Sequence, residues 1–177
     1  MKKLWLALGL GILVLSAMLL TGCSGNGVVP PPPEEPPIDL IREYTARDYV
    51  QRWADGVVSV VDFTGKTKQI WAEVNEIING PVVFKMTNDP TAQIGIEYQP
   101  IDGMFYVGFP GMEDNVFKKC GILINPEVPS DLLDTVCMLA VFIAVGINNP
   151  EKWDEGFSQQ MKTVIYWLYR LEPGSPL

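Results

Sequence analysis

Hydrophobic and polar residues recur with two different periods along the chain, and the periods predict an alternation of strands and helices. Residues 49–53 and 57–62 read as extended runs on either side of an Asp-Gly turn, the second being rich in β-branched residues. Between 66 and 79 the apolar residues recur at steps of three and four, which is typical of a helix with one buried face. Asn79-Gly80-Pro81 supplies the end of that helix.

The pattern continues with shorter elements. Strands are predicted at 82–86 and 94–98, a strand or an irregular edge at 104–109, and a short strand at 121–125. We interpret the charged pairs at 113–114 and 118–119 as solvated loop. Residues 38–47 are either a short helix or an irregular lead-in, and a final helix is expected from about 158 to 171.

The most apolar stretch of the domain is predicted to be a helix over residues 135–147. Val136 to Ile147 are twelve consecutive apolar or glycine residues, and a helix that is apolar on every side belongs in a core. Twelve residues are too few to cross a bilayer. Ser130 or Asp131 is the expected N-cap, Asp134 suits the helix dipole, and Gly146 is the expected end.

These elements predict an α+β fold in one domain over residues 38–177. We expect a twisted mixed sheet of about four to five strands, packed on two long helices, with an additional C-terminal helix. A chain of this length can bury about two-thirds of its unfolded surface in a single core.

The first 22 residues read as a signal peptide, with two lysines before an apolar run from 4 to 20. Leu20-Thr21-Gly22-Cys23 resembles the bacterial lipobox, in which the cysteine receives a diacylglyceryl group, so Cys23 is the predicted lipidation site. An uncleaved signal anchor is the alternative. Lipidation, with fatty acids such as palmitate, places the protein in the cell envelope, held to a membrane at Cys23 and facing the periplasm or the cell exterior.

Residues 24–37 contain six prolines and are predicted to be an extended tether, which together with Cys23 links the lipid to the domain. At about 3.1 Å per residue the tether reaches roughly 40 Å.

Charge and composition exclude several functions. The chain carries a net charge of −8, and removal of Lys2 and Lys3 leaves 11 basic against 21 acidic residues, which argues against a nucleic-acid partner. The chain has no histidine, which excludes Ser-His and Cys-His nucleophile pairs and histidine-based metal sites. We expect no metal and no other cofactor.

Two further cysteines, Cys120 and Cys137, allow either a disulfide in an exported protein or two buried thiols. Both lie in apolar runs, and the sequence leaves the two readings open.

The order of the elements resembles the matrixin-like branch of the metzincin metalloproteases. The resemblance rests on V-V-S-V-V-D, A-E-V-N-E-I-I-N-G, P-V-V-F, N-D-P and I-G-I-E-Y in sequence, on the flanks of the apolar helix, and on the closing L-Y before Pro-Gly. Asn75 matches an asparagine of the family, whereas Val74 replaces its usual tryptophan.

The metzincin zinc motif HExxHxxGxxH is degenerate in this chain. Aligned on Gly146, its zinc-ligand positions hold Leu139, Ile143 and Asn149, and its general-base position holds Ala140. Leucine and isoleucine cannot bind zinc, and alanine cannot take a proton. The resemblance therefore implies a pseudo-peptidase, not an active enzyme.

Three functions follow as hypotheses. The first is an envelope lipoprotein that binds a peptide or protein partner along the edge of its sheet. The second is a structural lipoprotein of unrelated α/β fold with no ligand site. The third is a non-metal hydrolase that uses a carboxylate pair, Asp131/Asp134 or Asp154/Glu155, although these residues are better read as helix caps and loop charge.

Overall fold

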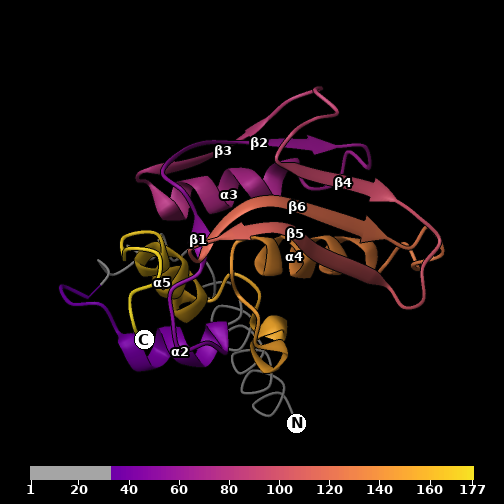
Figure 1. Cartoon of the computed structure of the whole chain (residues 1–177). Helices are drawn as coiled ribbons and strands as arrows, with labels where there is room; N and C mark the ends of the chain where they lie inside the picture. Colours follow the sequence, from indigo (N-terminus) through magenta and orange to yellow (C-terminus); the bar gives the residue numbers. More distant parts are fainter. Residues whose placement is uncertain (1–32) are drawn as a thin grey trace, which may run out of the picture. The chain divides into compact units, whose positions relative to one another are not determined.

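A computed structural model of the chain describes residues 33–177, without the side chains of 153–155. The predicted signal peptide, Cys23 and most of the tether lie outside these residues. The elements are α2 (Ile38–Thr45), β1 (Arg52–Trp53), β2 (Gly56–Asp62), α3 (Lys68–Ile78), β3 (Val82–Met86), β4 (Ile94–Tyr98), β5 (Phe105–Glu113), β6 (Val116–Ile124), α4 (Leu133–Ala144), the 3-10 helix η1 (Pro150–Glu155) and α5 (Gln159–Leu168) (Figure 1).

The strands form one six-stranded sheet. Five of them follow the order β1-β6-β4-β2-β3, and the sixth, β5, lies outside this order and pairs with β6. Every strand pair is parallel except β5–β6, which is antiparallel. We expected a twisted mixed sheet of about four to five strands; the sheet has six strands and is almost entirely parallel. The reason is the connection through α3, which carries the chain back so that β3 runs in the same direction as β2.

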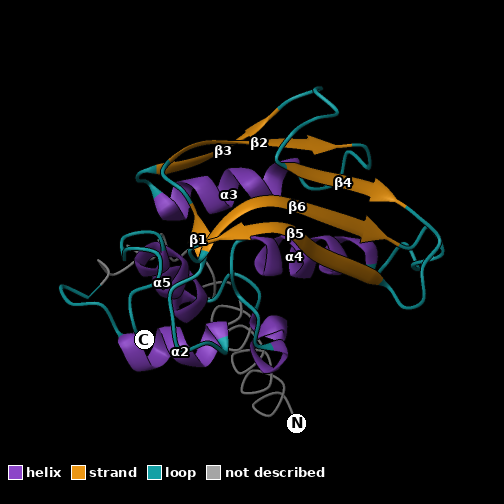
Figure 2. Ribbon diagram, viewed as in Figure 1, coloured by secondary structure: helices purple, strands orange, loops and turns teal. Residues whose placement is uncertain are grey.

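The helices α3 and α4 lie on the same face of the sheet (Figure 2). α3 packs on β3, α4 packs on β5 and β6, and α3 also contacts α4 and α5. Side chains on this face of β3 and β4 are buried, and their neighbours along each strand are exposed or half-buried. Sheets that are mostly parallel usually have both faces covered. Here the second face carries no helix within residues 33–177.

The hairpin of β5 and β6 replaces the loop that we expected at residues 113–119. Its turn residues, Asp114 and Asn115, have φ of 49° and 64°, the left-handed values that a two-residue hairpin turn requires. Gly108, Pro110 and Gly111 lie in β5, and the pairing register shifts between Gly108 and Met112. These breaks interrupt the alternating pattern, so the sequence did not show the length of the strand.

The start of α4 also differs from the expectation. Its N-cap is Leu132, which makes no side-chain capping hydrogen bond, so neither Ser130 nor Asp131 caps the helix. By contrast, Ser158 caps α5 by accepting a hydrogen bond from the Met161 N–H at 3.1 Å. In the described part of the chain, no helix is both long and apolar enough to span a membrane.

Candidate functional site

The turn just after α4 contains a glycine, Gly146, that no other residue could easily replace. Gly146 has a φ of 106°, in the left-handed region that side chains rarely adopt. A Cβ at this position would lie 2.9 Å from the Gln51 carbonyl oxygen and 3.1 Å from Leu168. The sharp end that the sequence predicted at Gly146 is therefore present, and it places the residues after α4 against α2.

The positions of α4 that align with the degenerate zinc motif differ in burial. Ala140 is fully buried, whereas Leu139 and Ile143 are half-buried. Residues four apart share one face of a helix. Leu139 and Ile143 thus form a stripe of α4 that remains partly accessible beside buried neighbours.

Asn149, aligned with the third zinc ligand, is fixed to α2 by its hydrogen bonds. Its side-chain amide donates to the Glu43 carbonyl oxygen at 2.7 Å, and its Oδ1 accepts from the Glu151 N–H at 3.1 Å. Its backbone N–H donates to the Tyr44 carbonyl oxygen at 3.0 Å. The asparagine therefore joins two segments of the fold and is already satisfied as a hydrogen-bonding group.

The carboxylates considered for a hydrolase do not form a described site. Asp131 and Asp134 are both exposed near the start of α4. The side chains of Asp154 and Glu155 lie outside the description. Within residues 33–177, leaving out those side chains, no three Cys, Asp or Glu residues lie close enough together to hold a metal ion.

Cys120 on β6 and Cys137 on α4 are both buried and free, so the disulfide that we considered is not formed. Burial raises the pKa of the Cys120 thiol to about 12. Burial, together with the nearby Asp62 and Asp134 carboxylates, raises the pKa of the Cys137 thiol to about 11. Both thiols remain protonated at neutral pH and act as small apolar side chains of the core.

The edge strand β5 has backbone groups that point away from the sheet. The Asn125 N–H donates to the Met104 carbonyl oxygen, which makes these two residues a hydrogen-bonded pair of the antiparallel ladder. Such pairs alternate with pairs that exchange no hydrogen bond. Tyr106 and Gly108 therefore bond to β6, and the N–H and C=O of Val107 point outward with no partner in the described residues.

The opposite edge strand, β3, is closed by a side chain. Asn75 on α3 donates to the Phe84 carbonyl oxygen at 2.8 Å, and its Oδ1 accepts from the Phe84 N–H at 2.8 Å. One amide side chain thus occupies both outward groups of Phe84, as a neighbouring strand would. Blocking an exposed edge is a known protection against unwanted strand pairing. The two edges therefore differ: β3 is capped at its centre, and β5 is open at Val107.

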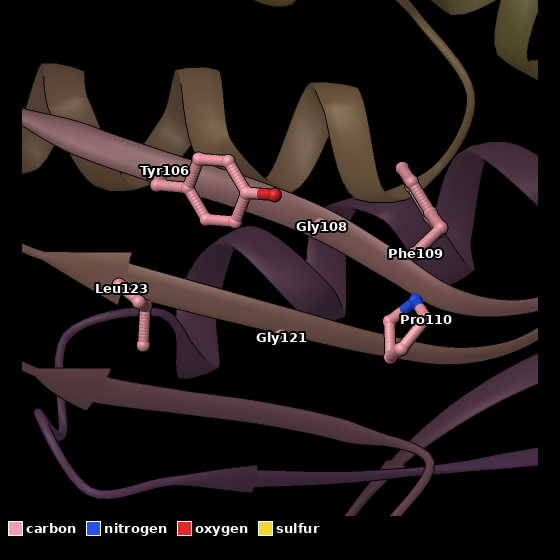
Figure 3. A pocket seen from close by; sticks show the side chains of 6 residues that line it. All are labelled: Tyr106, Gly108, Phe109, Pro110, Gly121 and Leu123. Carbon is pink, nitrogen blue, oxygen red and sulfur yellow. The ribbon is translucent and has the colours of Figure 1, made fainter.

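A shallow depression of about 350 Å³ lies on the face of the sheet that has no helix (Figure 3). Its lining residues come from β5 and β6: Tyr106, Gly108, Phe109, Pro110, Gly121 and Leu123. The Tyr106 ring lies so close to Gly108 that a Cβ there would be 2.9 Å from Tyr106 Cε1. The Tyr106 ring therefore covers the backbone of Gly108, which has no side chain. The depression adjoins β5 and widens the accessible surface along this edge.

Arg47 lies near the end of α4 and was not singled out from the sequence. Its guanidinium is 5.7 Å from the centre of the Phe117 ring, and Phe117 stacks on Phe109 of β5. With its amide oxygen facing Arg47, Asn148 accepts from Nε at 2.8 Å and from Nη2. Burial lowers the pKa of Arg47 to about 10, and the group remains charged at neutral pH.

Asp62, at the end of β2, has five hydrogen bonds within its own loop. Its oxygens accept from the N–H and hydroxyl of Thr64, from the N–H and hydroxyl of Thr67, and from the Gly65 N–H, at 2.6–3.1 Å. Burial raises the pKa of Asp62, but these hydrogen bonds outweigh it and hold the pKa below its usual value. Asp62 thus organises the loop before α3.

Comparison of the chain with protein families, curated proteins and solved structures identified no relative. No family model matches the chain, and neither the curated proteins nor the solved structures give a match.

Proposed function

We propose that this chain is an envelope lipoprotein whose domain binds an extended segment of a peptide or protein along β5. The lipid at Cys23 would hold the protein to the membrane, and the tether would let the domain reach its partner at a distance from the lipid surface. In this proposal the domain has no peptidase activity.

The observation that carries the proposal is the difference between the two edges of the sheet. Asn75 fills the outward groups of Phe84 on β3, whereas Val107 on β5 keeps an N–H and a C=O for a partner. An added strand binds through such main-chain groups and gains specificity from the side chains around them. Half-buried apolar residues of α4, Leu139 and Ile143, supply accessible apolar surface on the helix that packs against β5.

The matrixin-like framework belongs to the same proposal. Strand, helix, strand, turn and strand follow one another from β2 to β4 as in the sequence motifs, and Gly146 lies just after the end of α4. The aligned zinc positions hold Leu139, Ile143 and Asn149, and none of the three is a usual zinc ligand. The proposal is that a cleft that binds substrate strands was retained as a binding edge after its catalytic residues were replaced.

The main alternative is a structural envelope lipoprotein with no ligand site. It requires no special residue, and it predicts that neither edge of the sheet contacts another protein. A non-metal hydrolase is the weaker alternative, because Asp131 and Asp134 are exposed near the start of α4 and neither lines the depression on β5 and β6.

Site-specific photocrosslinking in cells tests the proposal. Benzoylphenylalanine at Tyr106, an exposed residue of β5, should give a discrete adduct with another envelope protein. The same probe at Tyr49, which is exposed to a similar extent in a segment before β1, is the matched control and should give none. Equal labelling at both positions, or no adduct at Tyr106, would leave the structural lipoprotein as the better account.

A backbone variant shows whether an adduct depends on strand pairing. Val107→Pro removes an outward N–H without removing a hydrogen bond to β6, and proline is tolerated at such positions of edge strands. The Tyr106 adduct should decrease strongly in the Val107→Pro chain. If the adduct is unchanged while the chain stays folded, the partner contacts this surface without adding a strand.

A further inference from the structure

A strand added along β5 would present its side chains alternately to the two faces of the sheet. Val107, whose N–H and C=O point outward, pairs with Ile122 of β6, which is fully buried on the face that α3 and α4 cover. The partner residue that bonds to Val107 therefore directs its side chain to the covered face. Its two neighbours direct theirs to the helix-free face, one beside Tyr106 and the other beside Gly108.

The partner position beside Gly108 adjoins the depression. Gly108 pairs with Gly121 of β6, Tyr106 pairs with Leu123, and all four residues line the depression. In Figure 3, Tyr106 and Leu123 lie at one end of it, Pro110 lies at the other, and the two glycines lie between them. A Cβ at Gly121 would meet no heavy atom within 4 Å. The pairing and the shared lining therefore place these residues on one continuous surface.

The lining of the depression is apolar. None of the six lining residues is charged, and the Tyr106 hydroxyl is their only polar side-chain group. A charged side chain buried here would find no ion-pair partner among the lining residues, which makes its burial costly. An aromatic side chain suits the depression better, because the Tyr106 ring is 59% exposed and can pack against a second ring. An aromatic ring also covers the bare backbone that a glycine leaves in a sheet.

We infer that the depression is a subsite for one aromatic side chain of the bound strand, at the position beside Gly108. This inference rests on the proposed strand addition at β5 and adds a sequence requirement to it. The bound strand must carry an aromatic residue next to the residue that bonds to Val107. The aromatic ring would pack against Tyr106 and cover the backbone between Tyr106 and Pro110.

The spacing of the strands sets the reach of this aromatic side chain. Neighbouring strands lie about 4.8 Å apart, so the backbone of the bound strand is roughly 10 Å from Gly121 and roughly 14 Å from Gly95. Gly95 of β4 pairs with Gly121 on the same face. A ring in the depression can contact a side chain introduced at Gly121, whereas a side chain at Gly95 is one strand too far away.

Selection of peptides tests the subsite. A phage-displayed library of random peptides of about nine residues, the length of a long strand, is selected on the full chain in phosphatidylcholine nanodiscs, after depletion on empty nanodiscs. Each selected peptide is synthesised together with a version in which its aromatic residue is replaced by serine. The serine version should bind wild type about tenfold more weakly, as expected for the loss of a pair of packed rings.

Matched variants locate the bound aromatic side chain. Gly121→Leu fills the depression and leaves the backbone groups of Val107 unchanged, so on this variant the two peptide versions should differ by less than about twofold. Gly95→Leu is the control, because a Cβ at Gly95 also meets no heavy atom within 4 Å, and it should retain the difference seen with wild type. Tyr106→Ala should reduce the difference, whereas Tyr106→Phe, which keeps the ring, should retain it.

Val107→Pro separates this inference from the proposed function. If the selected peptides bind Val107→Pro as tightly as wild type, or if no peptide is selected, strand addition at β5 is wrong and the subsite is wrong with it. If Val107→Pro abolishes binding but the peptides lack an aromatic residue, strand addition holds and the subsite is wrong. The same conclusion follows if replacement by serine weakens binding equally on wild type and on Gly121→Leu.

Discussion

Replacing Asn75 with alanine opens the edge of β3 and should destabilise the domain in a predictable way. The substitution removes both hydrogen bonds to Phe84, each 2.8 Å long. Each contributes about 0.5–1.5 kcal/mol to stability, so their loss costs about 1–3 kcal/mol. Alanine recovers roughly 0.5 kcal/mol of helix propensity in α3, which leaves a net loss of about 0.5–2.5 kcal/mol.

The assay is urea unfolding of the Asn75→Ala chain beside wild type and a matched control. Glu76→Ala changes the next residue of α3, which is exposed, and controls for the altered propensity of the helix. The unfolding midpoint of Asn75→Ala should fall below both. Sedimentation should also show greater self-association of Asn75→Ala at equal concentration, because the outward N–H and C=O of Phe84 become available to a second chain.

Two results would refute this reasoning. If Asn75→Ala and Glu76→Ala unfold at the same urea concentration, the two hydrogen bonds contribute nothing to stability. If Asn75→Ala is less stable but associates no more than wild type, Asn75 supports α3 without protecting the β3 edge. The contrast between the two edges, on which the proposed function depends, would then lose its basis.

Three other predictions follow from single residues. Gly146→Ala should lower stability by about 2 kcal/mol or more, because alanine is strained at this φ and meets backbone at 2.9 Å, whereas Gly121→Ala, where a Cβ meets nothing, should be close to neutral in thermal unfolding. Asp62→Asn should be less stable than wild type at pH 7, because the lowered pKa of Asp62 marks a carboxylate that stabilises the fold above its unfolded pKa near 4. That difference should shrink as the pH falls below about 4, and a constant difference in urea midpoint would contradict the assignment. If Cys23 is lipidated, the N-terminal peptide of wild type should carry a lipid mass that the Cys23→Ser chain lacks; an unmodified N-terminal peptide in both chains would favour the signal-anchor alternative.

Part of this fold could be read directly from the sequence. The helix α3 and the strands β3 and β4 have clear periods and end at Gly, Pro or Asn, so their positions were predicted to within about two residues. The turn at Gly146 was also predicted, since a glycine after a long apolar run is a common helix end.

Other features depend on contacts that leave no periodic pattern. The β5–β6 hairpin has Gly108, Pro110 and Gly111 within one strand and a register shift, so it resembles a loop in sequence. The edge of β3 is capped by a contact between Asn75 and Phe84, which are nine positions apart. The family resemblance had indicated only that Asn75 matches an asparagine of the family. Val107 became a candidate only after the pairing of β5 and β6 fixed which amides point outward.

Hydrogen exchange of individual backbone amides in the isolated chain tests the central claim most directly. The claim is that β5 offers an open edge, whereas β3 does not. The Phe84 amide should exchange slowly although it lies on an edge strand, because Asn75 holds it. The Val107 amide should exchange much faster than those of Tyr106 and Gly108 on the same strand. Slow exchange at Val107, or equally fast exchange at Phe84 and Val107, would contradict the account.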